Sequence, residues 1–211
     1  MPKTVTMLLF VACLLVGVCA AQTDLVLGQS SGNVQFSNPA GTVDISFAGD
    51  VCGSNCLSGF GYYGTTVGNY EISLTGTPIL GAPSQGVYPV NMNGSALAFD
   101  WSSGSSFLDG NITLDSVTDG TQTPRVLGSM YVTAANLGGY VAGSNVSLDF
   151  NVYLGSNPSL DYVAQNQGSS TEGYISAGEI NQGSTPEPGT FVLFGSGIMG
   201  LGLVIKRKLR L

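Results

Sequence analysis

The chain has 211 residues and a formal net charge of −7, with 13 acidic residues against six Lys and Arg, and it contains no His. Without His, a Ser-His-Asp or Cys-His nucleophile and a histidine metal site are both excluded. Between Gln22 and Thr185 the only basic residue is Arg125, so this region lacks the basic face with which proteins bind nucleic acid.

The first residues have the pattern of a secretory signal peptide. Lys3 precedes the apolar stretch Met7–Val18, and the small residues Ala20 and Ala21 provide a cleavage site. We therefore expect residues 1–21 to be removed on export. The alternative is an N-terminal anchor that stays uncleaved.

Two cysteines, Cys52 and Cys56, remain after this segment, and they lie among small residues. In an exported protein, two cysteines this close favour a local disulfide. Closing so short a ring stabilises a fold less than closing a long one, so its expected role is to stiffen a loop. A metal site would need further ligands, and the chain has no third cysteine after residue 21.

The middle of the chain predicts successive β-strands separated by Gly, Pro, Asn and Asp. In residues 42–48 and 145–154, apolar side chains alternate with polar ones, the period of a half-buried strand. One apolar and one polar face are typical of antiparallel sheets. We expect further strands at 25–27, 33–37, 70–74, 87–90, 96–101, 112–117 and 126–134, with turns at Asp109-Gly110 and Asp119-Gly120.

About eight to ten strands at this spacing predict an all-β fold, an antiparallel β-sandwich or jelly-roll-like domain over residues 22–177. No stretch before the tail has convincing helical periodicity. The Gly- and Ser-rich residues 178–185 predict a flexible linker that follows the domain.

Aromatic side chains in predicted loops are candidates for contact with sugars, and Tyr63 and Trp101 are the two that we select. The alternative for Trp101 is a place in the core, because it shares a strand face with Phe99. A structure in which acids or aromatics converge in a cleft would decide between these interpretations.

Acidic residues offer weaker signals. A glycosidase needs two carboxyl groups about 5 to 10 Å apart, and no local pattern links any two of the glutamates 71, 172 and 179. Residues 109–115 do not match the calcium-binding loop of an EF-hand, although a calcium site built from distant loops stays open. We expect no cofactor, with calcium as the exception to test.

The tail at residues 186–211 combines three features in a fixed order. Two prolines open it and prevent a helix from continuing through this point. The uncharged stretch 190–205 follows and predicts a single transmembrane helix, short for a span but extended by the basic side chains after it. The opening motif is Pro186, Glu187, Pro188 and Gly189, and the basic end, which we expect to act as a cytoplasmic stop-transfer signal, is Lys206, Arg207, Lys208 and Arg210.

This order of features resembles the PEP-CTERM sorting signal of Gram-negative bacteria. The resemblance implies processing near residues 186–188 by an exosortase, a membrane-embedded cysteine protease/transpeptidase-like enzyme, and delivery to the cell surface or the exopolysaccharide matrix. It implies as partners the exosortase, the inner membrane and, for a matrix protein, exopolysaccharide. The alternative is an ordinary C-terminal anchor that nothing cleaves.

For the domain itself we expect a non-enzymatic role. The alternatives are a carbohydrate-binding module that acts on exopolysaccharide and, with least support, a small glycosidase.

Overall fold

The fold is seen in a computed structural model that describes residues 23–49, 52 and 55–182. Within these ranges the chain forms strands and one short helix, so the all-β prediction is confirmed. The elements are β1 (Leu25–Ser30), β2 (Asn33–Ser37), β3 (Val43–Ala48), β4 (Cys56–Tyr63), β5 (Thr66–Thr75), β6 (Ile79–Leu80), β7 (Val87–Asn91), β8 (Ala96–Ser103), β9 (Ser106–Thr118), β10 (Arg125–Ala135), β11 (Asn145–Tyr153), α2 (Leu160–Gln165) and β12 (Ser170–Asn181).

The predicted signal peptide at 1–21 and the predicted transmembrane helix at 190–205 lie outside the described residues. Among the residues that are described, no helix combines the length and the apolar character that a membrane crossing requires.

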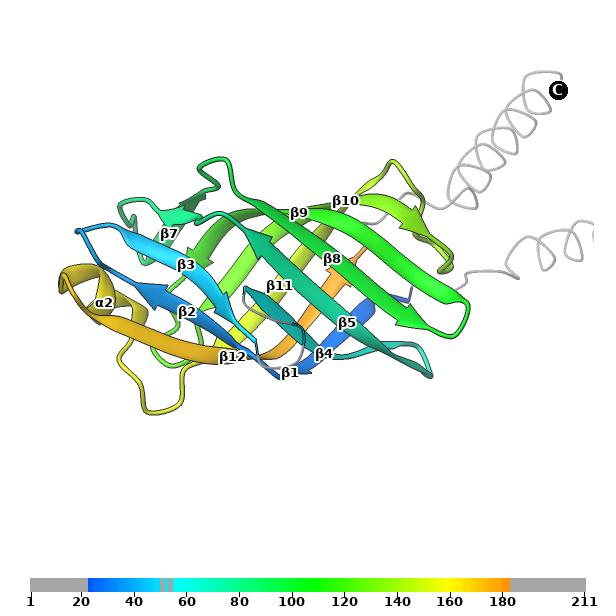
Figure 1. Cartoon of the computed structure of the whole chain (residues 1–211), viewed down its shortest axis with the longest axis horizontal. Helices are drawn as coiled ribbons and strands as arrows, with labels where there is room; N and C mark the ends of the chain where they lie inside the picture. The colour runs from blue at the N-terminus through cyan, green and yellow to red at the C-terminus, as the bar shows by residue number, and fades with distance from the viewer. Residues whose placement is uncertain (1–22, 50–51, 53–54, 183–211) are drawn as a thin grey trace, which may run out of the picture. The chain divides into compact units, whose positions relative to one another are not determined.

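Hydrogen bonds join all twelve strands into a single antiparallel sheet (Figure 1). Its strand order is β1-β4-β5-β8-β9-β10-β11-β12-β2-β3-β6-β7, and β1 also pairs with β12 while β9 also pairs with β7. The first of these extra pairings closes a ring of eight strands from β1 to β12. The architecture therefore differs from the predicted β-sandwich or jelly-roll, because the strands belong to one continuous sheet that curls back on itself.

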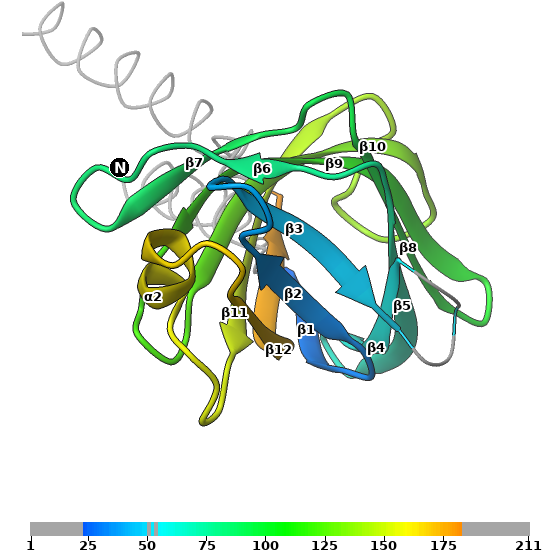
Figure 2. The same cartoon turned by 60° about the vertical axis from the view of Figure 1, so that its left-hand side comes forward.

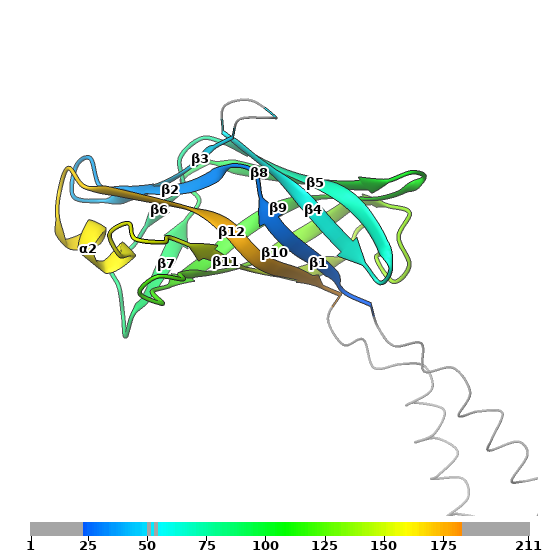
Figure 3. The same ribbon diagram turned by 90° about the horizontal axis from the view of Figure 1, so that it is seen from below.

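The long strand β12 explains how the ring and the remaining strands are joined. Its first part, Ser170–Gly173, pairs with β2, and its last part, Gly178–Ile180, pairs with β1. Between these partners the backbone N–H of Ile175 donates to the hydroxyl of Ser30, 2.9 Å away and buried. The view in Figure 3 shows β1 and β2 along successive parts of β12.

The core fills the inside of this curled sheet, because alternate side chains of each strand point inward. Its largest member is Trp101, fully buried on β8, whose indole N–H donates to the carbonyl of Gly61 at 3.2 Å. A Cβ on Gly61 would lie 2.7 Å from the Trp101 ring, and one on Gly68 would lie 2.6 Å from it. The two glycines therefore make the room that this indole occupies.

The helix α2 packs beside the strands near the start of β12 (Figure 2). Ser159 caps it by accepting from the backbone N–H of Tyr162, and it buries Leu160 and Val163. The hydroxyl of Tyr88 on β7 donates to Asp161 at 2.9 Å. This six-residue helix was not predicted, because so short a segment does not show a helical period.

Two boundaries differ from the sequence predictions. Asp109-Gly110 forms no turn but lies inside β9, and the turn comes earlier at Gly104, whose φ is 61°. The predicted linker at 178–185 is also wrong at its start, because residues 178–181 are the last part of β12 and pair with β1 and β11. The domain therefore extends at least to Asn181.

Candidate functional site

The two cysteines form the predicted disulfide, with their Cα atoms 5.8 Å apart. Cys56 opens β4, so the bond ties the segment before this strand to the strand itself. The sulfurs and a carboxylate oxygen of Glu71 lie within 4.8 Å of one another. Because the two sulfurs are bonded to each other, they are not thiolates and this group is a poor metal site.

A groove with a volume of about 910 Å³ lies beside this disulfide, on the outer face of the sheet. Residues from β1, β4, β5 and β8 line it, and these strands are neighbours in the ring. Most of the residues that line it carry polar side chains, with hydroxyl, amide and carboxylate groups. Its exposed side chains include Gln29, Phe60, Asn69, Glu71, Asp100 and Ser102.

An aromatic platform lies in this groove. Phe60 points outward from β4 and is 58% exposed, which is unusual for a side chain of its size. It lies directly opposite Asn69 on β5, and Asn69 lies opposite Ser102 on β8. The amide of Asn69 and the hydroxyl of Ser102 therefore lie in line with the ring of Phe60, across the next two strands of the sheet.

A row of three acidic residues crosses the next position of the same strands. Glu71 lies opposite Asp100, and Asp100 lies opposite Asp109 on β9. Burial, and then the neighbouring Asp100 carboxyl, raise the pKa of Asp109 above its usual value. All three residues line a second hollow of about 220 Å³, and only Glu71 and Asp100 also line the groove, so the acidic row borders the groove and continues beyond it.

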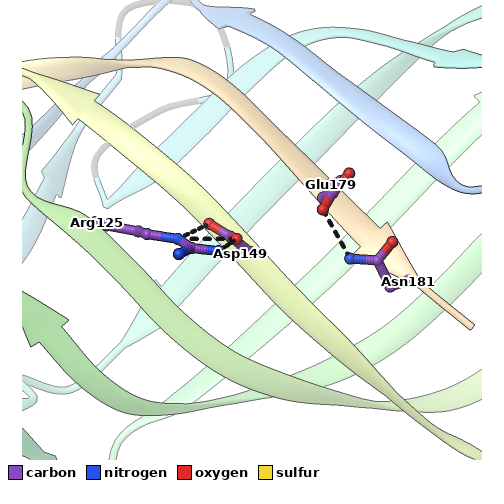
Figure 4. Close-up of polar contacts among 4 residues, drawn as sticks. All are labelled: Arg125, Asp149, Glu179 and Asn181. Carbon is purple, nitrogen blue, oxygen red and sulfur yellow. Dashed lines mark hydrogen bonds and ion pairs between the residues drawn. The ribbon is translucent and has the colours of Figure 1, made fainter. Parts of the chain in front are cut away.

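A second acidic pair on the sheet has a cationic partner, unlike this row. Asp149 on β11 lies opposite Glu179 on β12, and Arg125 donates to both Asp149 oxygens from its Nε at 2.9 Å (Figure 4). This contact raises the pKa of Arg125. Arg125 is the only cation between residues 4 and 205, so the groove carboxylates have no cationic side chain from the domain.

The structure separates the two aromatic residues selected from the sequence. Trp101 is buried in the core, so its predicted contact with sugar is wrong and the alternative holds. Tyr63 ends β4 beyond the groove lining, where its hydroxyl donates to the carbonyl of Gly138 at 2.5 Å. Neither side chain lines the groove.

Phe60 is the functional candidate that sequence reasoning did not select. A signal was present: Ser58, Phe60 and Tyr62 alternate with Leu57, Gly59 and Gly61. Two of the three inward positions are glycines, so the alternation of apolar and polar side chains that indicates a strand is missing here.

The predicted sorting residues in the C-terminal tail lie outside the described residues. They are Pro186 to Gly189 and the basic end at 206–210. A family model described as the PEP-CTERM protein-sorting motif matches residues 184–208. The tail carries a PEP-CTERM protein-sorting motif. This match supports an exported protein with membrane-associated C-terminal sorting and processing by an exosortase. No curated protein and no solved structure shows a match to the chain.

Proposed function

We propose that this PEP-CTERM protein is a non-enzymatic component of the cell surface or exopolysaccharide matrix, and that its groove binds exopolysaccharide. The observation that carries the proposal is the exposed Phe60 ring beside hydrogen-bonding groups from two neighbouring strands. The motif directs the chain to an exosortase, and the domain holds the matrix once it is outside.

The groove offers the two kinds of contact that a sugar ring needs. Its apolar C–H face packs on an aromatic ring, and Phe60 provides such a ring in the open. The hydroxyls at the edge of the sugar find acceptors in Glu71 and Asp100, and donors and acceptors in Asn69 and Ser102. An open groove along the sheet suits a chain of sugars better than a single small molecule.

Charge narrows the class of polysaccharide. The groove lining includes two carboxylates and no cation. A polymer rich in uronic acid or phosphate would be repelled, whereas neutral sugars are accepted and amino sugars are attracted. We therefore propose a neutral or amino-sugar polymer as the ligand.

A small glycosidase is the second candidate, and the raised pKa of Asp109 is the observation that favours it. Asp100 and Asp109 are, however, directly opposite each other on β8 and β9, close enough for the Asp100 carboxyl to contribute to the raised pKa of Asp109. Glycosidases hold their carboxyl groups about 5 to 10 Å apart, so that the sugar or a water fits between them. This closer contact supports binding over hydrolysis.

The binding proposal is tested by affinity electrophoresis of the domain, residues 22–185, through gels that contain neutral, amino-sugar or uronic-acid polysaccharides. Phe60→Ala should weaken retardation by about tenfold, the equivalent of ~1.4 kcal/mol. Tyr162→Ala removes an aromatic ring of similar exposure outside the groove, and it should leave retardation unchanged. Equal behaviour of the two variants would refute the groove.

The same gels test the need for a metal ion. We propose that binding needs no cofactor, so EDTA should not change retardation. If EDTA abolishes it and calcium restores it, an ion held by the acidic row takes part. Release of reducing sugars that Glu71→Gln or Asp100→Asn abolishes would instead favour the glycosidase.

Processing is tested separately, by mass spectrometry of the C-terminus in cells with and without the exosortase. We expect loss of residues beyond the region of Pro186–Pro188 only when the enzyme is present. A tail that still ends at Leu211 in both strains would leave an uncleaved anchor as the role of this segment.

A further inference from the structure

Both ends of the domain emerge at the same end of the sheet, which we call the tether end. Leu25 at the start of β1 pairs with Ile180 near the end of β12. Beyond this pair, the backbone N–H of Gln182 donates to Asp24 at 3.3 Å. The last described residues therefore lie beside the first, at the ends of β1 and β12 in Figure 3.

Three hairpin connections belong to the tether end, because the register places them there. They join β4 to β5, β8 to β9, and β10 to β11. Their residues, 64–65, 104–105 and 136–144, include no charged side chain. The connections at the opposite end, by contrast, include Asp119 and Asp161.

Exposed apolar side chains lie near these uncharged connections, and Asp24 and Glu179, the partner of Val26, are the carboxylates at the same end. Ten large hydrophobic residues are exposed in the described part of the chain. Five of them lie on or within three residues of these connections or chain ends, and a sixth, Tyr131, pairs with Asn145 directly after the β10–β11 connection. Val26, Tyr62 and Val67 form one row across β1, β4 and β5. The whole set is Val26, Tyr62, Val67, Phe107, Tyr131 and Val141, of which Val141 is the most exposed at 65%.

Hydrogen bonds hold the tether end in one arrangement. The long β10–β11 connection accepts from Tyr63 and from the side chain of Gln182 at the carbonyl of Gly138, at 2.5 and 3.0 Å. Asn136 in the same connection donates to the carbonyl of Ser105 at 3.0 Å. The apolar side chains are therefore presented on a preformed surface, which lowers the entropy lost on contact.

From these observations we infer that the tether end rests on the head-group region of the lipid bilayer to which the tail leads. The uncharged stretch begins at Thr190, eight residues after Gln182, so the reach between them is at most about 28 Å. Tyr and other amphipathic aromatics favour the membrane–water interface, and uncharged connections avoid the cost of dehydrating charge there.

Because the tether is short, even a weak contact between the tether end and the bilayer contributes to membrane binding. A second site joined by a short linker meets its partner at an effective concentration in the millimolar range. A few exposed side chains bind a bilayer poorly on their own, so cutting the tail should also release the surface. The apolar residues come from strands on different sides of the ring, β1, β4 and β5 against β9 and β10, which fits a plane better than a second copy of the chain.

The inference depends on the membrane-associated tail and not on the groove, so the two proposals fail independently. It is tested with residues 22–211 in phosphatidylcholine vesicles. The two cysteines in this range are bonded to each other, so a single added cysteine can be labelled with an environment-sensitive fluorophore. Val141→Cys reports on the tether end, and Tyr162→Cys on α2 is the control with similar exposure.

We expect the label at residue 141 to shift to the blue and to be quenched by lipids with nitroxide head groups, at least threefold more than the label at 162. Cutting at a protease site inserted after Gly183 should remove this quenching. Equal quenching at the two positions, or quenching that persists after the cut, would overturn the inference. Energy transfer between labelled copies without lipid quenching would show a second chain as the occupant.

Discussion

The hydroxyl of Tyr140 donates to the carbonyl of Ile180 at 2.5 Å and accepts from the backbone N–H of Leu25 at 2.9 Å. One side chain from the β10–β11 connection thus joins the first and the last strand at the point where the ring closes. Its burial raises the pKa of the phenol, so the hydroxyl stays protonated and able to donate.

Tyr140→Phe should lower the free energy of unfolding by about 1–3 kcal/mol, because it leaves a buried N–H and a buried carbonyl without this partner. Urea denaturation measures the change. Tyr131→Phe, an exposed tyrosine on β10, is the control and should cost little. Equal values for the two would show that the buried hydroxyl does not stabilise ring closure.

Gly61→Ala should destabilise the domain by about 1–3 kcal/mol, since the new methyl group would overlap the Trp101 ring. Thr66→Ala, at an exposed position on β5, provides the comparison. Near-ultraviolet circular dichroism of the single Trp should change with Gly61→Ala and not with the control. An unaltered Trp signal would contradict the packing described above.

Asp109→Asn should stabilise the domain at pH 7 by a few tenths to about 1 kcal/mol, the range for cross-strand charge pairs. The pKa of Asp109 is raised in the folded state, so its contribution to stability is fully present below pH 3.8 and is lost as the pH rises through the folded pKa. The advantage of the variant should therefore shrink as the pH falls through the folded pKa and disappear below pH 3.8. Thermal melts across this range check the sign, with Asp115→Asn as the control.

Replacing both Cys52 and Cys56 by Ser should cost about 2 kcal/mol, the loop-entropy value for a closed loop of about five residues. Reducing agent should lower the stability of the wild-type domain by the same amount and leave the variant unchanged. Because Cys52 lines the groove, retardation by polysaccharide should also weaken. A variant with unchanged stability and binding would show that this bond constrains neither.

Sequence reasoning succeeded where apolar and polar residues alternate without interruption. Residues 145–154 show this pattern, and β11 spans Asn145–Tyr153. It failed at β4, where two inward positions are glycines and the side chains of Tyr70 from β5 and Trp101 from β8 occupy the space beside them. It also failed at Asp109-Gly110, a favourable turn pair that tertiary packing places inside β9, with Gly110 against Met130.

The groove could not be predicted from the sequence for a different reason. Gln29, Phe60, Glu71 and Asp100 come together only through the register of four strands. A shift of one residue in any pairing would turn its outward side chains inward, and no local pattern states which register is adopted. The tail was predictable because its signal is contiguous and its residues act through order along the chain.

Under export from the N-terminus, which the predicted signal peptide implies, the pairing of β1 with β12 decides when the domain can finish folding. A chain that crosses a membrane from its N-terminus delivers β1 first, yet the strand that completes its pairing is the last one of the domain. The ring cannot close until residues 178–180 have crossed, and by then the tail is at the membrane.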